Sequence, residues 1–296
     1  MKKLFKTAVS VIACAITSLS VVGFAACEDI RKLEIDLSVY NYSDSVFYTV
    51  DEVSLSVDLY RHLAPKTVDS VLEHVKNGFY NDAVFYYDSK VSSQIMIGDY
   101  KIENGALVQN LINGKLPSEI YGEFEYGGTT GSNLISEKGS IGIWRSYYKE
   151  DTDMFKSSAA RDSGRATWYI PTTTKSDYTG WLCVFGQYDR NDEVNSAAIT
   201  AISGILASAD NSEKFVVYYT GEYDAAKPDE NYGLTFHAVT ESLWNDNYDS
   251  ENNLYDGVAV FVSEGAQLAC YDYRTITVAK LFNGKSGAAI KTVKVK

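Results

Sequence analysis

The side chains that most often bind metals or transfer protons are sparse in this chain, and their spacing assembles no site. Glu150, Asp151 and Asp153 form an acidic run of the oxygen ligands that calcium prefers, although a solvated run of charges is the simpler interpretation. The 3 histidines match no metal-ligand spacing: His62, His74 and His237. We therefore expect no metal site and no cofactor.

The 4 cysteines point to other chemistry. Cys14 lies inside an apolar N-terminal stretch, and Cys27 ends that stretch. Cys183 and Cys270 lie in the body of the chain. Outside the cell these two could form a disulfide, and two buried free thiols are the alternative.

The first 26 residues have the order of an export signal. Lys2, Lys3 and Lys6 form a basic start, and an uncharged apolar stretch follows from Ala8 to Ala26. The stretch is short for a membrane span of about 20 strongly apolar residues, and its Ser and Thr residues weaken it further.

The end of this stretch predicts a lipid anchor. Phe24-Ala25-Ala26-Cys27 resembles a bacterial lipobox, where the cysteine becomes the new N-terminus and carries lipid. A plain secretory signal that precedes a cysteine is the alternative. Each buried CH₂ of an acyl chain adds about 0.8 kcal/mol of membrane binding. We predict that residues 1–26 are removed and that the lipid on Cys27 anchors an exported protein to the outer face of the bacterial cytoplasmic membrane.

The charge of the chain limits its partners. It has 27 basic and 39 acidic residues, for a formal net charge of −12, and removal of the signal lysines makes it more acidic. Nucleic acid is excluded because no surplus of cations could neutralise phosphates. An anionic membrane surface also repels the body, so the lipid would be its sole membrane contact.

Residue periodicity predicts strands with two main helices. Alternation in 53–59 indicates a half-buried strand, and Pro65 begins a helix that Gly78 ends. Residues 194–207 form an Ala- and Ile-rich helix, and 145–165 read as a long loop. The other strand-like segments are 79–87, 93–97, 140–144, 166–170, 182–185, 215–220, 234–239, 258–262, 275–282 and 289–295. One barrel or sandwich is the simplest architecture.

Residues 57–87, which read VDLYRHLAPKTVDSVLEHVKNGFYNDAVFYY, resemble the opening of a cyclophilin, the peptidyl-prolyl isomerase family. Residues 97–100, 138–144 and 164–186 resemble later family segments in the right order, so the resemblance covers about 51–208. It implies a mainly β fold, a closed barrel of about eight strands with two capping helices. We expect a lead-in or tether over 27–50, a cyclophilin-like domain over 51–296, and a β-rich extension in 209–296.

The chemistry that this resemblance implies is rotation about an X–Pro amide, whose uncatalysed barrier is about 18–20 kcal/mol. A catalyst must bind the twisted amide better than either planar form. An apolar pocket for the proline ring and a donor aimed at the prolyl nitrogen suffice, and in the family the donor is an arginine.

At the positions that match the family site, most of the polar groups are replaced. Tyr87 stands where the family has its arginine, and Met96 where it has glutamine. The remaining groove positions hold Trp144, Tyr169, Tyr178 and Leu182. A different interpretation makes the tyrosines simple half-buried barrel residues. Three nearby arginines could supply a donor or be solvated loop charges: Arg145, Arg161 and Arg165.

Two functions therefore compete. The first is an envelope isomerase that acts on proline-containing segments of exported proteins, with weak or absent activity because its site is degenerate. The second is a catalytically inactive module that binds peptides or proteins at the cell surface. A weaker third idea is sugar binding on exposed aromatic rings, since the chain has 23 tyrosines.

Overall fold

The computed structural model describes residues 30–43, 46–88, 94–104, 106–124, 134–145, 163–175, 178, 180, 182–207, 215–220, 235–252, 254–261, 277–280, 282–283 and 286–295. The expected signal, Cys27, Cys270, the acidic run and nearly all of the predicted loop at 145–165 lie outside these residues. None of the helices in the described ranges is both long and apolar enough to cross a membrane.

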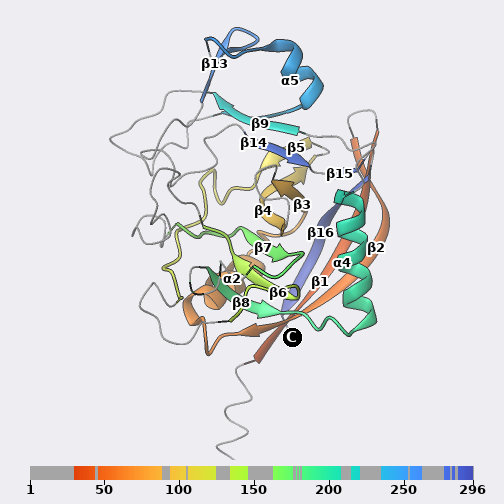
Figure 1. Ribbon diagram of the computed structural model, residues 1–296, viewed down its shortest axis with the longest axis vertical. Coiled ribbons are helices and arrows are strands. Elements are labelled where there is room, and N and C mark those ends of the chain that lie inside the picture. The colour runs from red at the N-terminus through yellow and green to blue at the C-terminus, as the bar shows by residue number, and fades with distance from the viewer. Residues whose placement is uncertain are drawn as a thin grey trace, which may run out of the picture.

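Eight antiparallel strands pair in a ring (Figure 1). In order around the ring they are β3 (Ala83–Asp88), β16 (Ser286–Val295), β1 (Ile30–Ser43), β2 (Val46–Tyr60), β8 (Cys183–Gln187), β6 (Ser140–Ile143), β7 (Trp168–Pro171) and β4 (Gln94–Glu103). Pairing of β4 with β3 closes the ring, and β5 (Ala106–Gln109) pairs with the C-terminal part of β4, beyond the residues that pair with β7. The predicted mainly β barrel of about eight strands is confirmed.

The expected lead-in is largely strand. Residues 30–43 form β1, which lies between β2 and β16 in the ring, and β2 begins at Val46. Leu33, Ile35 and Leu37 are buried while Lys32 is exposed, which is the alternation of a strand with one face on a core. The barrel therefore begins about twenty residues before the expected boundary at residue 51.

The two predicted helices are present and are held at their N-termini by side chains. In α2 (Pro65–Lys76) the Glu123 carboxylate accepts the backbone N–H groups of Lys66 and Thr67, at 2.9 and 2.7 Å. At α4 (Glu193–Ala207) the Asp192 carboxylate accepts the N–H of Asn195 at 2.9 Å. The Asn195 amide oxygen in turn accepts the N–H of Ser56 on β2, which ties α4 to the barrel.

The inside of the ring is the main hydrophobic core. Alternate residues of each strand point into it, among them Ile95 and Ile97 of β4 and Trp168 and Ile170 of β7. Their neighbours on the same strands, such as Met96 and Tyr169, are buried as well but lie outside this cluster. The barrel is therefore covered on part of its outer face too.

The C-terminal region both completes the barrel and forms an added element. After α4 come β9 (Phe215–Thr220), β10 (Thr235–Thr240), α5 (Glu241–Asn247), β11 (Tyr248–Asp249), β12 (Leu254–Tyr255), β13 (Val258–Phe261), β14 (Thr277–Lys280) and β15 (Phe282–Asn283). Strand β14 pairs with β9 and with β3, so the added sheet continues from the barrel at β3. The last strand, β16, then returns to the ring.

Aromatic rings form the small core of the added element. Trp244 stacks on Tyr248 and Tyr255 with ring centroids 4.3 and 5.1 Å apart, and Tyr218 stacks on His237 at 4.8 Å. Burial raises the pKa of Tyr218 to about 12. Trp244 is buried, so these rings pack on one another instead of forming an open platform for a sugar.

Candidate functional site

Strand pairing places Met96 and Tyr169 in one row across the outer face of the barrel. Met96 of β4 pairs with Tyr169 of β7, and Tyr169 pairs with Gly142 of β6. Tyr86 of β3 pairs with Met96 on the other side. Because directly paired residues share a face, these four residues form one row, here called the outer row.

Gly142 makes room for the Tyr169 ring. A Cβ atom at position 142 would lie 2.3–2.6 Å from three atoms of that ring, which is far inside van der Waals contact. Tyr169 is fully buried, and burial raises the pKa of its hydroxyl, which stays protonated at neutral pH.

Three aromatic rings from different segments meet beside the outer row. Trp144 lies 6.1 Å from both Tyr169 and Tyr178, and the last two are 6.0 Å apart at 90°, all measured between ring centroids. Tyr178 and Leu182 are buried, and the Leu182 N–H donates to the Tyr178 carbonyl at 3.0 Å. The predicted groove residues Met96, Trp144, Tyr169, Tyr178 and Leu182 therefore lie together.

One predicted site residue lies elsewhere. Tyr87 packs against the inner core and lines a cavity beneath α4, whereas its neighbour Tyr86 lies in the outer row. Burial raises the pKa of Tyr87, and a hydrogen bond with Ser203 opposes the rise. The placement of Tyr87 in the groove is thus corrected to Tyr86, because successive residues of a strand point to opposite faces.

The Tyr86 hydroxyl is committed to a carboxylate. It donates to Asp99, which also accepts the Thr167 hydroxyl at 2.6 Å. Close approach of the strands allows this contact, since a Cβ at Gly98, whose φ is +122°, would lie 2.6 Å from the Ala166 carbonyl oxygen. In the outer row the phenol therefore has an acceptor before any substrate arrives.

The arginines near the groove serve the scaffold. Arg145 is only 2% exposed, donates to the Ile120 carbonyl at 2.9 Å and lies over the Phe124 ring. Its interpretation as a solvated loop charge is wrong, because its side chain is buried. Arg165 donates to the Pro117 carbonyl and to Glu119, while Arg161 lies outside the described residues.

One cationic and one polar side chain also lie near these residues. The Lys175 ammonium lies 5.7 Å from the centroid of Tyr178. Gln94, two residues before Met96 and therefore on the same face, is fully buried, and its Nε2 lies 3.2 Å from the Met96 sulfur. The i, i+2 spacing of Gln94 and Met96 in a strand was the signal that could have placed this amide.

Cys183 is a buried free thiol, 3.5 Å from the Thr67 hydroxyl. Among the described residues, no three histidine, cysteine, aspartate or glutamate side chains gather where they could hold a metal ion.

The sequence matches the family model described as cyclophilin type peptidyl-prolyl cis-trans isomerase/CLD over residues 46–213. A comparison with curated proteins found no match. A solved cyclophilin type peptidyl-prolyl cis-trans isomerase from Cryptosporidium parvum is similar at 15% identity with a TM-score of 0.32, covering 57% of this chain and 83% of that chain. Its structure in the presence of the dipeptide Ala-Pro gives 14% identity, a TM-score of 0.29, and coverage of 54% and 83%.

The family match begins inside the barrel, one strand after β1. The match starts at residue 46, where β2 begins, and it ends at residue 213, before the added element. Because it spans more than half of the sequence, the chain belongs to the cyclophilin type peptidyl-prolyl cis-trans isomerase family.

Proposed function

We propose that this chain is an exported, lipid-anchored envelope protein whose cyclophilin-type domain binds proline-containing segments of exported proteins with weak or absent isomerase activity. The observation that carries the proposal concerns two tyrosines: Tyr87, which stands where the family has its arginine in sequence, and Tyr86, which lies in the outer row. Tyr86 donates to Asp99, and Tyr87 faces the α4 cavity. Neither hydroxyl is directed to an amide bound over the outer row.

Energetics favour weak catalysis. Removing one donor aimed at a transition state costs about 2.7–4 kcal/mol, or about 10²–10³ in rate. A neutral phenol is a weaker donor than a guanidinium, and here it is already engaged. Arg145 and Arg165, the described arginines of this region, donate to backbone carbonyls at the barrel end.

Binding of a peptide is supported by the aromatic residues of the outer face. The partly exposed Trp144 ring and the buried Tyr169 and Tyr178 rings form an apolar wall of the kind that contacts a proline ring. Tyr169 and Tyr178 are both buried, so little of their surface is open to a substrate, which favours weak binding and slow turnover.

The test measures binding and turnover separately. NMR exchange spectroscopy on an Ala-Pro-containing peptide gives the cis–trans rate, and changes in the peptide's proline signals report binding. We expect binding with at most a small acceleration, and no binding of a peptide with alanine in place of proline. Rapid turnover by the unaltered protein would contradict the degenerate site, and absence of both effects would contradict peptide recognition.

The catalytically inactive module is the second candidate, supported by the engaged hydroxyl of Tyr86. This candidate would be favoured if the unaltered protein and Trp144→Phe both bind the peptide and neither accelerates its cis–trans isomerisation.

The anchor is tested independently of the barrel. Cys27→Ala is expected to move the protein from the detergent phase to the aqueous phase in detergent partition of bacterial membranes. Unchanged partition would contradict lipidation. Cys183→Ala is the matched control, since that thiol is buried inside the barrel.

A further inference from the structure

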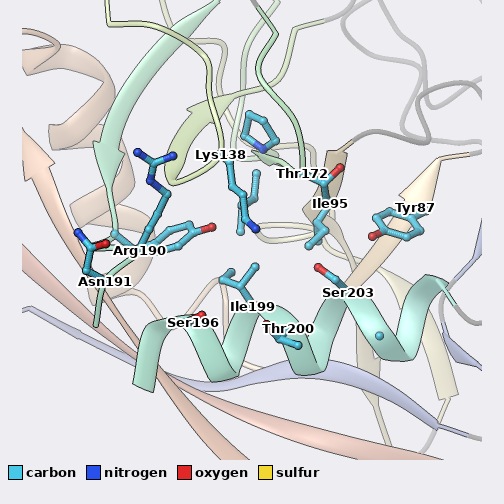
Figure 2. A pocket seen from close by; sticks show the side chains of 14 residues that line it. Tyr87, Ile95, Lys138, Thr172, Arg190, Asn191, Ser196, Ile199, Thr200 and Ser203 are labelled. Atoms are coloured by element: carbon cyan, nitrogen blue, oxygen red, sulfur yellow. The ribbon is translucent and has the colours of Figure 1, made fainter. Parts of the chain in front are cut away.

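A cavity of about 660 Å³ lies between α4 and the strands β3, β4 and β7, on the face opposite the outer row (Figure 2). On each of these strands, a residue that lines the cavity stands next to a residue of the outer row. The cavity receives Tyr87, Ile95 and Ile170. It is therefore separate from the groove in which proline binding is proposed.

Small residues of α4 leave this space open. The helix packs its Ala198, Ile202 and Leu206 into the barrel core. Its cavity side instead carries Ser196, Thr200, Ser203 and Gly204, at the spacing of one helix face. A Cβ at Gly204 would meet no atom within 4 Å.

The deep part of the cavity is apolar, with Ile95, Ile170, Pro171 and Ile199 in its lining. Burial of an apolar group against such side chains is worth about 25 cal/mol per Å² removed from water. The volume lies within the range of about 300–1,000 Å³ that is usual for small-molecule sites.

The charged residues that line the cavity are all basic. Lys138 and Arg190 line the cavity, both are exposed, and none of the described lining residues is acidic. Figure 2 shows the amino end of Lys138 directed toward α4. In a chain with a formal net charge of −12, a concave site with two cations and no acid selects for negative charge.

Hydroxyl groups complete the lining and suit an oxygen-rich anion. Tyr87, Thr172, Thr200 and Ser203 all line the cavity. A second hollow of about 620 Å³ shares Arg190 and Thr200 with the cavity and has the acidic Glu193 in its lining, so Arg190 borders both spaces.

From these features we infer that the α4 cavity binds a small organic acid, with its carboxylate at Lys138 and Arg190 and its apolar body against the isoleucines. The isoleucines supply affinity, and the two cations distinguish an anion from a neutral molecule of the same shape. This inference does not depend on isomerase activity.

Three probes of equal chain length test it by titration calorimetry: octanoate, 1-octanol and octylammonium. We expect octanoate to bind at least tenfold more tightly than octanol, and octylammonium to bind most weakly. Lys138→Gln is expected to weaken octanoate binding about tenfold and to leave octanol binding unchanged. Lys76→Gln, which removes an exposed lysine of α2 outside the cavity lining, is the control and should change neither.

Filling the cavity tests its location. Gly204→Leu projects a side chain into the open space and replaces a helical glycine by a better helix former, so the fold should be kept. We expect it to abolish binding of octanoate and octanol alike. Equal affinity of unaltered protein for the three probes, no octanoate binding at all, or octanoate binding that survives Gly204→Leu would each overturn the inference.

Discussion

A substituted arginine can test which face of β3 carries the isomerase site. Tyr86 pairs with Met96 in the outer row, whereas Tyr87 lines the cavity under α4. Tyr86→Arg therefore places a guanidinium on the face of Trp144 and Tyr169, and Tyr87→Arg places the same group on the opposite face. The two variants change adjacent residues of equal type and form a matched pair.

The size of the expected effect follows from the lost donor. A charge-assisted donor in the transition state is worth about 10²–10³ in rate. Asp99 lies within hydrogen-bonding reach of residue 86 and will hold part of the new guanidinium, so only a fraction of this factor can return. We expect Tyr86→Arg to accelerate X–Pro isomerisation at least tenfold over the unaltered protein, about 1.4 kcal/mol, and Tyr87→Arg less than twofold.

The assay is NMR exchange on a proline-containing peptide, with circular dichroism and thermal unfolding to show that each variant is folded. A larger acceleration by Tyr87→Arg than by Tyr86→Arg would refute the strand register on which the argument depends. A folded Tyr86→Arg protein that binds the peptide but does not accelerate exchange would refute the electrostatic explanation of the weak activity.

Three further predictions concern stability and reactivity. Gly142→Ala should lower the free energy of unfolding in urea by about 1–3 kcal/mol, because its methyl group displaces the Tyr169 ring. Gly204→Ala, in open space on α4, should instead raise this free energy by about 0.5–1 kcal/mol. A similar change in both variants would contradict the packing of Gly142 against Tyr169. Burial lowers the pKa of His74, and Ser70 and Glu73 partly oppose this decrease. As the pH falls, His74 therefore takes up a proton near pH 6.5 in the unfolded chain but only at a lower pH in the folded chain. Stability should fall as the pH drops below about 6.5, and His74→Gln should flatten that decline; an identical slope would exclude His74 as its source. Cys183 should react with a thiol reagent only after denaturation, since it is buried. Rapid modification of Cys183 itself in the native protein would contradict this placement.

Local patterns in the sequence were sufficient for the helices and most strands. Pro65 and Gly78 bracket α2, and the alternation of 53–59 falls inside β2. The strand over 30–43 was predicted to be part of a lead-in or tether, because its polar face resembles a solvated segment until its partners β2 and β16 are known. Residues 79–82, expected to be strand, form the turn between α2 and β3. Backbone hydrogen bonds hold this turn, among them the bond from the Phe79 N–H to the His74 carbonyl at the end of α2.

The site shows where sequence reasoning ends. Met96 and Tyr169 lie side by side because β4 pairs with β7, and the rings of Trp144 and Tyr178 pack beside Tyr169. The β3–β4 register shifts between Ala83 and Phe85, and such an irregularity has no signature in a single sequence. The burial of Arg145 could not be predicted from the sequence either, because its partner, the Ile120 carbonyl, lies 25 positions away in the chain.

The position of β16 has a consequence for how the molecule assembles. Leu33 pairs with Val295, about 260 residues further along, so the ring cannot close until β16 has been made. Contacts this distant in sequence form slowly, because the entropy of a very long loop is lost before they are gained. Until then β1 and β3 keep open edges that can pair with other chains, so a polypeptide shortened by ten residues is expected to aggregate.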